Sequence, residues 1–125
     1  MDLKRDIIKY CRDKAKSRYK KDTECRICGA TEELQLHHYY SMTPLLERFL
    51  RKIKVEITCE DDILVYRDQF ISAHHTQIYD DTVTLCKYHH MDQLHKIYGK
   101  TPNLGTAEKQ RRWVERQREK HRNTE

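Results

Sequence analysis

The sequence has little glycine or proline and no long apolar stretch. Its 125 residues include three glycines and two prolines, so the repeats typical of flexible or disordered chains are missing. No apolar run approaches the ~20 residues that cross a bilayer. The start, MDLKRDIIKY, carries charges where a signal peptide is apolar. We therefore expect a single domain over 1–125, no membrane partner and a cytoplasmic location.

Apolar residues are also scarce, at 37% of the chain against 36% charged residues. This is polar for a small domain, which can bury only one modest core, and a structural metal would supply the missing stability. The five cysteines are an odd number. In a reducing compartment a Cys-x-x-Cys pair indicates a metal site or a redox pair and not a structural disulfide.

The net charge of +5 is unevenly distributed. Residues 1–21 carry nine Lys and Arg against three Asp, and residues 100–125 carry eight against four Glu, so both ends are basic and the middle is acidic. Basic ends suit double-stranded DNA, because phosphate charge dominates non-specific affinity. Solvated helix faces give the same pattern. The candidate DNA-binding residues are Lys4, Arg5, Lys9, Arg12, Lys16, Arg111, Arg112 and Arg116.

Apolar periodicity predicts several helices. An amphipathic helix is expected over 2–20, within the basic arm 1–21, and a charged helix over 106–122. Thr43 as N-cap and Pro44 as first residue predict a helix that ends near 53. KVEI should be extended, and Thr58 with Asp61 resembles a capping box that opens a helix to about 76. A hairpin of VEITC and ILVYR is the alternative.

Two short strands are also expected, which gives an α+β fold. Leu34 and Leu36 alternate with polar residues, so a strand should end near His37 and His38, with the two imidazoles facing opposite ways. TVTL at 82–85 is β-branched and alternating, and KYHHMDQLHKIYG after it is typical of a helix closed by Gly99.

Four residues have the chemistry of a closed tetrahedral zinc site. Cys25 and Cys28 form a Cys-x-x-Cys that can curl round an ion at Gly29, and Cys86 with His89 forms a Cys-x-x-His. A shifted alternative pairs Cys86 with His90. The set predicts a structural Zn²⁺ knuckle.

The remaining histidines are too many to be solitary core residues. His37 and His38 end a strand that should face a helix with further histidines. The economical interpretation is a second, open metal site. One strand histidine would bind the ion, and the other would act as general base near neutral pH.

These residues resemble the HNH endonucleases, and in particular the small enzymes of phages and homing elements. The resemblance lies in LQLHHYYS, in DDTVTLCKYHHMDQLHKIYG, and in the CRIC knuckle with Cys86 of the zinc-stapled branch. It covers about residues 24–100. It implies a small ββα-metal, treble-clef-like core with a helical insert at 43–78 and flanking basic helices at 1–21 and 106–122.

Carried onto this chain, the resemblance makes His37 and His90 ligands of a catalytic ion and His38 the general base, oriented by Asp81. The family commonly has a further histidine four residues after the second ligand, whereas the next one here is His95. Five residues are ~140° apart on an α-helix, against ~40° for four. Either His89 binds zinc and His95 is spare, which we favour, or the register shifts so that His90 binds zinc and His95 takes the catalytic position.

The implied function is a metal-dependent endonuclease that nicks or cuts duplex DNA with a divalent ion, Mg²⁺ or Mn²⁺, as a monomer or homodimer. A phage origin would place it in the host cytoplasm. Two alternatives compete with it. One is a non-catalytic zinc module that binds nucleic acid or protein, and the other is a decayed nuclease, which the unusual histidine spacing suggests.

Overall fold

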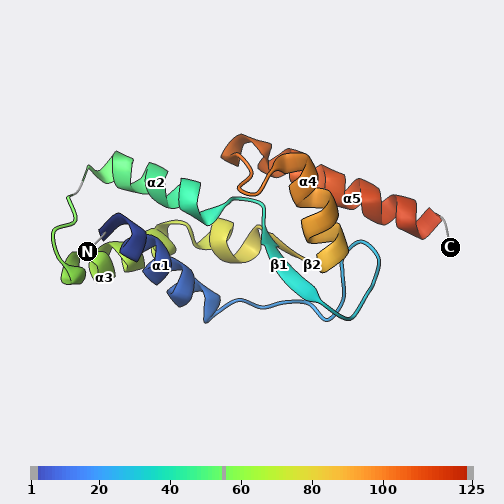
Figure 1. Ribbon diagram of the computed structural model, residues 1–125, viewed down its shortest axis with the longest axis horizontal. Helices are drawn as coiled ribbons and strands as arrows, with labels where there is room; N and C mark the ends of the chain where they lie inside the picture. The colour runs from blue at the N-terminus through green and yellow to red at the C-terminus, as the bar shows by residue number, and fades with distance from the viewer. Residues whose placement is uncertain (1–2, 55, 124–125) are drawn as a thin grey trace.

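The computed structural model describes residues 3–54 and 56–123, and it has the expected α+β composition. Two groups of elements lie at opposite ends of an elongated molecule (Figure 1). In chain order the elements are α1 (Leu3–Lys16), β1 (Leu34–His38), α2 (Met42–Ile53), α3 (Glu60–Ala73), the π-helix η1 (Thr76–Asp80), β2 (Thr82–Cys86), the π-helix η2 (Tyr88–Leu94), α4 (His95–Tyr98), the 3-10 helix η3 (Leu104–Thr106) and α5 (Ala107–Asn123).

One end of the molecule is helical and consists of α1, α2 and α3 (Figure 1). Their apolar stripes meet in a core that extends to η1 through Ile78. Phe70 of α3 and Leu45 and Leu46 of α2 are fully buried there, against Ile7 of α1. The predicted amphipathic patterns thus produce a small helical layer beside the strands.

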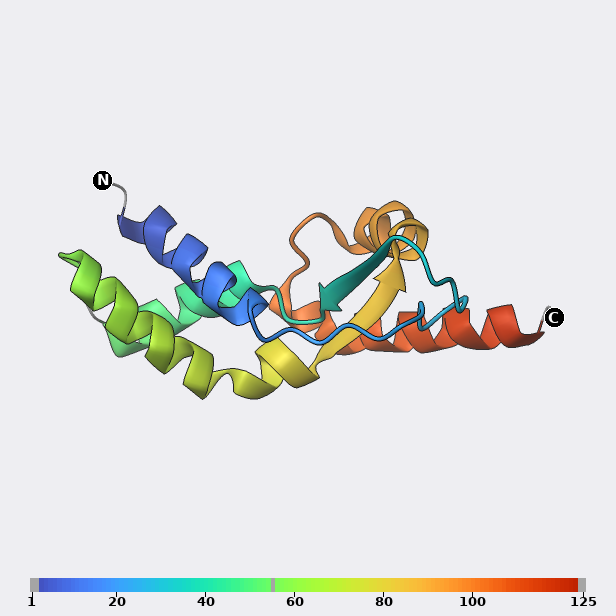
Figure 2. The same cartoon turned by 90° about the horizontal axis from the view of Figure 1, so that it is seen from below.

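The other end holds the β-ribbon with η2, α4 and α5 (Figure 2). β1 and β2 are antiparallel, with Leu34 opposite Cys86 and His38 opposite Thr82. Trp113 and Val114 of α5 pack with Leu85 and Leu94 in a second core. The ribbon therefore leads from β2 directly into η2, which brings the two histidine-bearing stretches together.

Several element boundaries differ from those predicted. α2 begins at Met42 after Ser41, so Thr43 is not its N-cap, and Thr43 Oγ1 accepts a hydrogen bond from Arg12 instead. α3 begins after Cys59, and Asp62, not Asp61, accepts from the backbone and hydroxyl of Thr58. The basic arm is helical only to Lys16, and residues 1–2 of it lie outside the described part of the chain.

The alternative hairpin does not form, because ILVYR lies within α3. Val55 of the expected extended segment KVEI is outside the described residues. The predicted helix after β2 exists, but it is a π-helix followed by a short α-helix, and Gly99 with φ 92° follows it. Among the described helices, none is both long and apolar enough to cross a membrane.

Candidate metal centres

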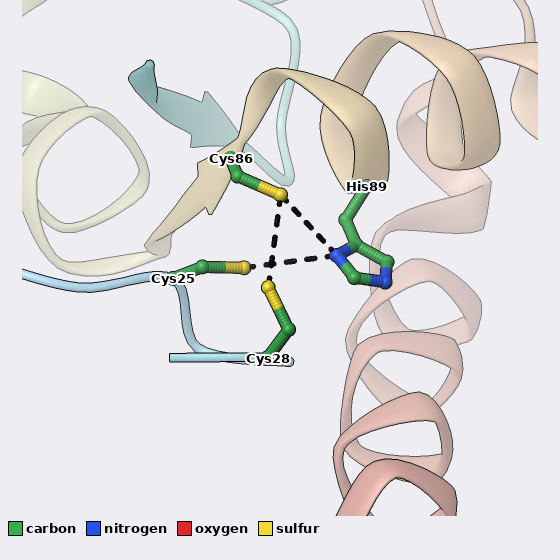
Figure 3. Close-up of side chains that lie close together, drawn as sticks. All are labelled: Cys25, Cys28, Cys86 and His89. Atoms are coloured by element: carbon green, nitrogen blue, oxygen red, sulfur yellow. Dashed lines mark hydrogen bonds between the residues drawn. The ribbon is translucent and has the colours of Figure 1, made fainter. Parts of the chain in front are cut away.

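Cys25, Cys28, Cys86 and His89 come together as the sequence predicted, in a group that could hold a metal ion (Figure 3). The Sγ atoms of Cys28 and Cys86 are 3.8 Å apart, and His89 Nδ1 lies 3.3 Å from Cys86 Sγ and 3.9 Å from Cys25 Sγ. Bonds of ~2.3 Å to a tetrahedral zinc would separate two sulfurs by about 3.8 Å. The spacing of the donors therefore fits zinc.

The knuckle owes its shape to local backbone bonds. Gly29 has φ 75°, which glycine adopts without strain, and its N–H donates to the carbonyl of Cys25 over 2.9 Å. The N–H of Arg26 donates to Thr84 of β2 over 2.9 Å, so the knuckle is attached to the ribbon that carries Cys86. Burial raises the pKa of Cys25, but backbone hydrogen bonds at Cys28, Cys86 and Ile27 outweigh it and lower that pKa. These hydrogen bonds thus favour the thiolate of Cys25, whereas burial raises the pKa of Cys28 to about 11.

His37, His90 and His95 form a second group of the same kind. His37 comes from β1, His90 from η2 and His95 from the start of α4. His90 Nε2 lies 3.0 Å from His37 Nδ1 and 3.0 Å from His95 Nε2. His37 and His90 are buried, whereas His95 is partly exposed. Three ring nitrogens from three elements therefore converge on one point that opens to solvent beside His95.

The outer nitrogen of each of these imidazoles faces an oxygen. His37 Nε2 lies 2.7 Å from Gln110 Oε1, His90 Nδ1 lies 2.7 Å from Gln35 Oε1, and His95 Nδ1 lies 2.8 Å from the carbonyl of Gly99. A ring nitrogen must donate to an amide or carbonyl oxygen, so these contacts favour a proton on the outer nitrogen of each ring. Metal-binding histidines typically have such a partner.

Burial keeps His37 and His90 neutral. With a smaller effect of the neighbouring histidines, burial lowers the pKa of His37 to about 3, against the hydrogen bond to Gln110, which raises it, and lowers the pKa of His90 to about 4. At neutral pH both rings are uncharged. Their inner nitrogens thus present lone pairs, the form in which imidazole binds a metal.

The π-helix explains why the five-residue spacing works. In η2 the backbone N–H of His95 donates to the carbonyl of His90, an i to i+5 bond. Residues five apart are therefore stacked one turn apart, and His95 lies over His90. The structure thus groups His95 with His37 and His90, and it groups His89, not His90, with the three cysteines.

His38 faces away from the three-histidine group, as the alternation of a strand predicts. Its ring lies 4.8 Å from the ring of Tyr19, and its Nε2 is buried without a hydrogen-bond partner. Burial lowers the pKa of His38, and a hydrogen bond to the backbone of Ile78 opposes this effect. The imidazole is thus held at one nitrogen and unpartnered at the other.

Asp81 does not contact His38 in the way that the resemblance implied. Its carboxylate accepts a hydrogen bond from Arg111 over 2.8 Å, and its carbonyl accepts one from the N–H of Tyr39 over 3.1 Å. Arg111 also lies over the ring of Tyr39 at 4.8 Å. Asp81 therefore ties α5 to the ribbon, and Arg111, one of the candidate DNA-binding residues, is occupied by this contact.

The other candidate DNA-binding residues lie on two separate helices. On α1, Arg5, Lys9, Arg12 and Lys16 are exposed, whereas the side chain of Lys4 lies outside the described part of the structure. On α5, Arg112 and Arg116 are exposed. These helices belong to opposite ends of the molecule, with the ribbon between them (Figures 1 and 2).

The sequence interpretation missed the residues that hold the imidazoles in place. Gln110 is the most informative of them, because it is fully buried on α5. Its position three residues after buried Ala107 and three before buried Trp113 puts it on the apolar stripe of a charged helix. A polar residue on such a stripe is the signal that could have revealed it. His74 and His75 lie outside both groups and contact Phe70 and Tyr79.

Comparison with known proteins identifies the family of this chain. No solved structure matches it. Its whole length, residues 1–125, matches the sequence model of a family of phage nucleases described as the nicking endonuclease family. Because the match spans the knuckle, both histidine stretches and both basic helices, the chain belongs to the phage T5 nicking endonuclease family.

Proposed function

We propose that this protein is a metal-dependent endonuclease of the HNH type that nicks duplex DNA. Family membership supports the nicking of DNA. The observation that supports metal dependence is the convergence of His37, His90 and His95, with each outer nitrogen engaged by an oxygen. A nucleic-acid-binding module without catalysis would have no need for a second, solvent-accessible group of donors beside its structural zinc.

In this proposal the three imidazoles hold one divalent ion and leave its remaining positions open. When bound, the ion polarises the scissile phosphate and stabilises the leaving 3′ oxygen. The protein supplies the neutral ligands, because burial keeps His37 and His90 unprotonated at the pH of the cell. The Cys25 group holds zinc and stabilises the loop that precedes β1.

His38 is the proposed general base. Its Nε2 has no partner within the protein, so it is free to take the proton of an attacking water. The hydrogen bond to the backbone of Ile78 orients the ring. Because Tyr19 packs against this imidazole, water must reach Nε2 along the edge of Tyr19 or after that side chain has moved. Asp81, in contact with Arg111, would hold α5 in place.

The DNA would approach at His95, the partly exposed member of the three-histidine group. A hollow of about 450 Å³ next to it is lined by Met91, Asp92, His95, Lys96 and Lys100. Two lysines beside a metal centre can bind the phosphates that flank the scissile bond. The exposed arginines of α5 and the basic side chains of α1 would extend this contact along the duplex.

Histidine ligands influence which ion is effective. Imidazole prefers Mn²⁺ or a later transition metal to Mg²⁺, which favours oxygen ligands. Cellular Mg²⁺ can still act if the substrate phosphate and water supply most of the ligands. We therefore expect activity with both Mg²⁺ and Mn²⁺, and at a lower concentration of Mn²⁺.

Supercoiled plasmid tests the function directly. Purified protein should convert it to relaxed circles in Mg²⁺ or Mn²⁺ before any linear product appears, which is the signature of nicking. EDTA, His38→Ala and His37→Ala should each abolish the conversion. His75→Ala is a matched control, because His75 is exposed and contacts Tyr79 instead of the metal groups.

Three outcomes would contradict the proposal. Plasmid that stays supercoiled with every metal would refute nuclease activity. Full activity of His38→Ala would refute the role of His38 as general base. Linear product from the start would indicate paired cutting by a dimer in place of nicking.

A further inference from the structure

Gln110 is the only charged or amide side chain among the fully buried residues of the described chain. It comes from α5, a helix with exposed charges on its other faces, and it reaches the three-histidine group from there. A buried amide is costly unless its donors and acceptor are all used. The hydrogen bonds of Gln110 therefore indicate its role.

The orientation of this amide is determined by its surroundings. Its Nε2 donates to Thr106 Oγ1 over 2.9 Å and to the carbonyl of Tyr39 over 3.4 Å. The carbonyl of Tyr39 can only accept, and the hydroxyl of Thr106 already donates to Asn103 over 2.6 Å. Oε1 must then face His37, whose Nε2 donates to it over 2.7 Å. The acceptor of Gln110 thus stabilises the tautomer of His37 with its proton on Nε2.

The position of the His37 proton determines whether the other ring nitrogen, Nδ1, can bind an ion. His37 Nδ1 lies 3.0 Å from His90 Nε2, close enough for one to donate a hydrogen bond to the other. If the proton of His37 were on Nδ1, it would occupy the space between the two rings, where an ion would bind. Without an acceptor at Gln110, the buried Nε2–H would have no partner, and a proton on Nδ1 would become the better arrangement.

We propose that Gln110 is a positioning residue that makes Nδ1 of His37 a metal ligand, so that α5 forms part of the metal centre. His90 and His95 would bind through Nε2. The inference rests on the proposed function, because it presumes that the group holds an ion. It also links the basic C-terminal helix to the centre, since Gln110 is followed by Arg111 and Arg112.

The test is a titration with Co²⁺ of protein whose cysteine group already holds zinc. Gln110→Leu removes the acceptor and keeps a similar volume. Gln117→Leu is the matched control, with the same change on the same helix two turns away and half buried. We expect Gln110→Leu to weaken Co²⁺ binding by ~10–100-fold, the usual effect of removing such a partner. Gln117→Leu should bind as the wild type does.

A second measurement does not depend on the folding of any variant. Long-range nitrogen–proton NMR spectra of the zinc-loaded wild type, without Co²⁺, report which nitrogen of each imidazole carries the proton. Nε2–H on His37 supports the inference, and Nδ1–H on His37 overturns it. Equal Co²⁺ affinity of Gln110→Leu and wild type also overturns it but leaves the proposed nuclease intact. Failure of the wild type to bind any Co²⁺ outside the cysteine group would refute the metal centre itself.

Discussion

The π-helix η2 should be replaceable by an α-helix if one residue is removed from it. On an α-helix, residues five apart are ~140° apart and rise about 7.5 Å, so two ring nitrogens about 5.5 Å from the axis would be about 13 Å apart. His90 Nε2 and His95 Nε2 are 3.0 Å apart in the structure. Deleting Asp92 shortens the spacing to four residues, or ~40°, and brings the same positions to about 7 Å on an ordinary α-helix. Two histidines four residues apart can close this distance by leaning towards each other, as they do in helical metal sites.

We therefore expect the protein without Asp92 to bind Co²⁺ at the three-histidine group and to nick plasmid. Inserting an alanine after Asp92 separates the histidines by six residues, or ~120° in the other direction, and should abolish both. Asp92→Ala controls for loss of the exposed carboxylate. Circular dichroism establishes that each variant is folded. Loss of Co²⁺ binding in a folded deletion variant, or its retention in the insertion variant, would refute the role assigned to the π-helix.

Three further predictions concern stability and DNA binding. Cys25→Ser should lower the melting temperature by at least about 10 °C, because zinc binding contributes directly to folding, and an unchanged melting curve would contradict the knuckle. The double variant Arg112→Gln, Arg116→Gln should bind DNA with a weaker salt dependence. The slope of log affinity against log salt concentration should become shallower by about 0.9 for each phosphate that the protein no longer neutralises. An unchanged slope would show that these arginines do not contact the DNA. The pKa of His37 is about 3 and that of His90 about 4, below the usual 6.5. The unfolded chain then binds more protons below pH 6.5, so metal-free protein should lose stability as pH falls towards 3, by at most about 1.4 kcal/mol per pH unit for each histidine. Chemical denaturation at several pH values measures this loss, and a flat profile would contradict the burial of the pair.

The sequence predicted that the three cysteines and His89 would come together, because their spacing is local. Cys25 and Cys28 lie on one turn, and Cys86 and His89 on another, so the two pairs needed only one antiparallel ribbon to meet. The helices and strands were likewise predicted from apolar periodicity. The first residues of α2 and α3 were not, because Thr43 bonds to the distant Arg12 and Thr58 bonds to Asp62 in place of Asp61.

The second group was harder to predict, since it depends on long-range contacts. His95 looked misplaced only because an α-helix was assumed, and i to i+5 bonding has no simple signature in YHHMDQLH. Gln110 is 73 residues from His37, so no spacing rule connects them. Trp113 and Val114 of the charged C-terminal helix belong to the core, which its composition did not indicate.

The two metal groups can be separated most directly by counting bound ions and measuring nicking on one preparation of protein. Wild type loaded with zinc and Mn²⁺ should hold two ions per chain by native mass spectrometry and should relax supercoiled plasmid. His90→Ala should keep the zinc of the cysteine group, lose the second ion and lose nicking. If His90→Ala retained both ions, or nicked plasmid at the rate of the wild type, the three-histidine group would not be the catalytic centre.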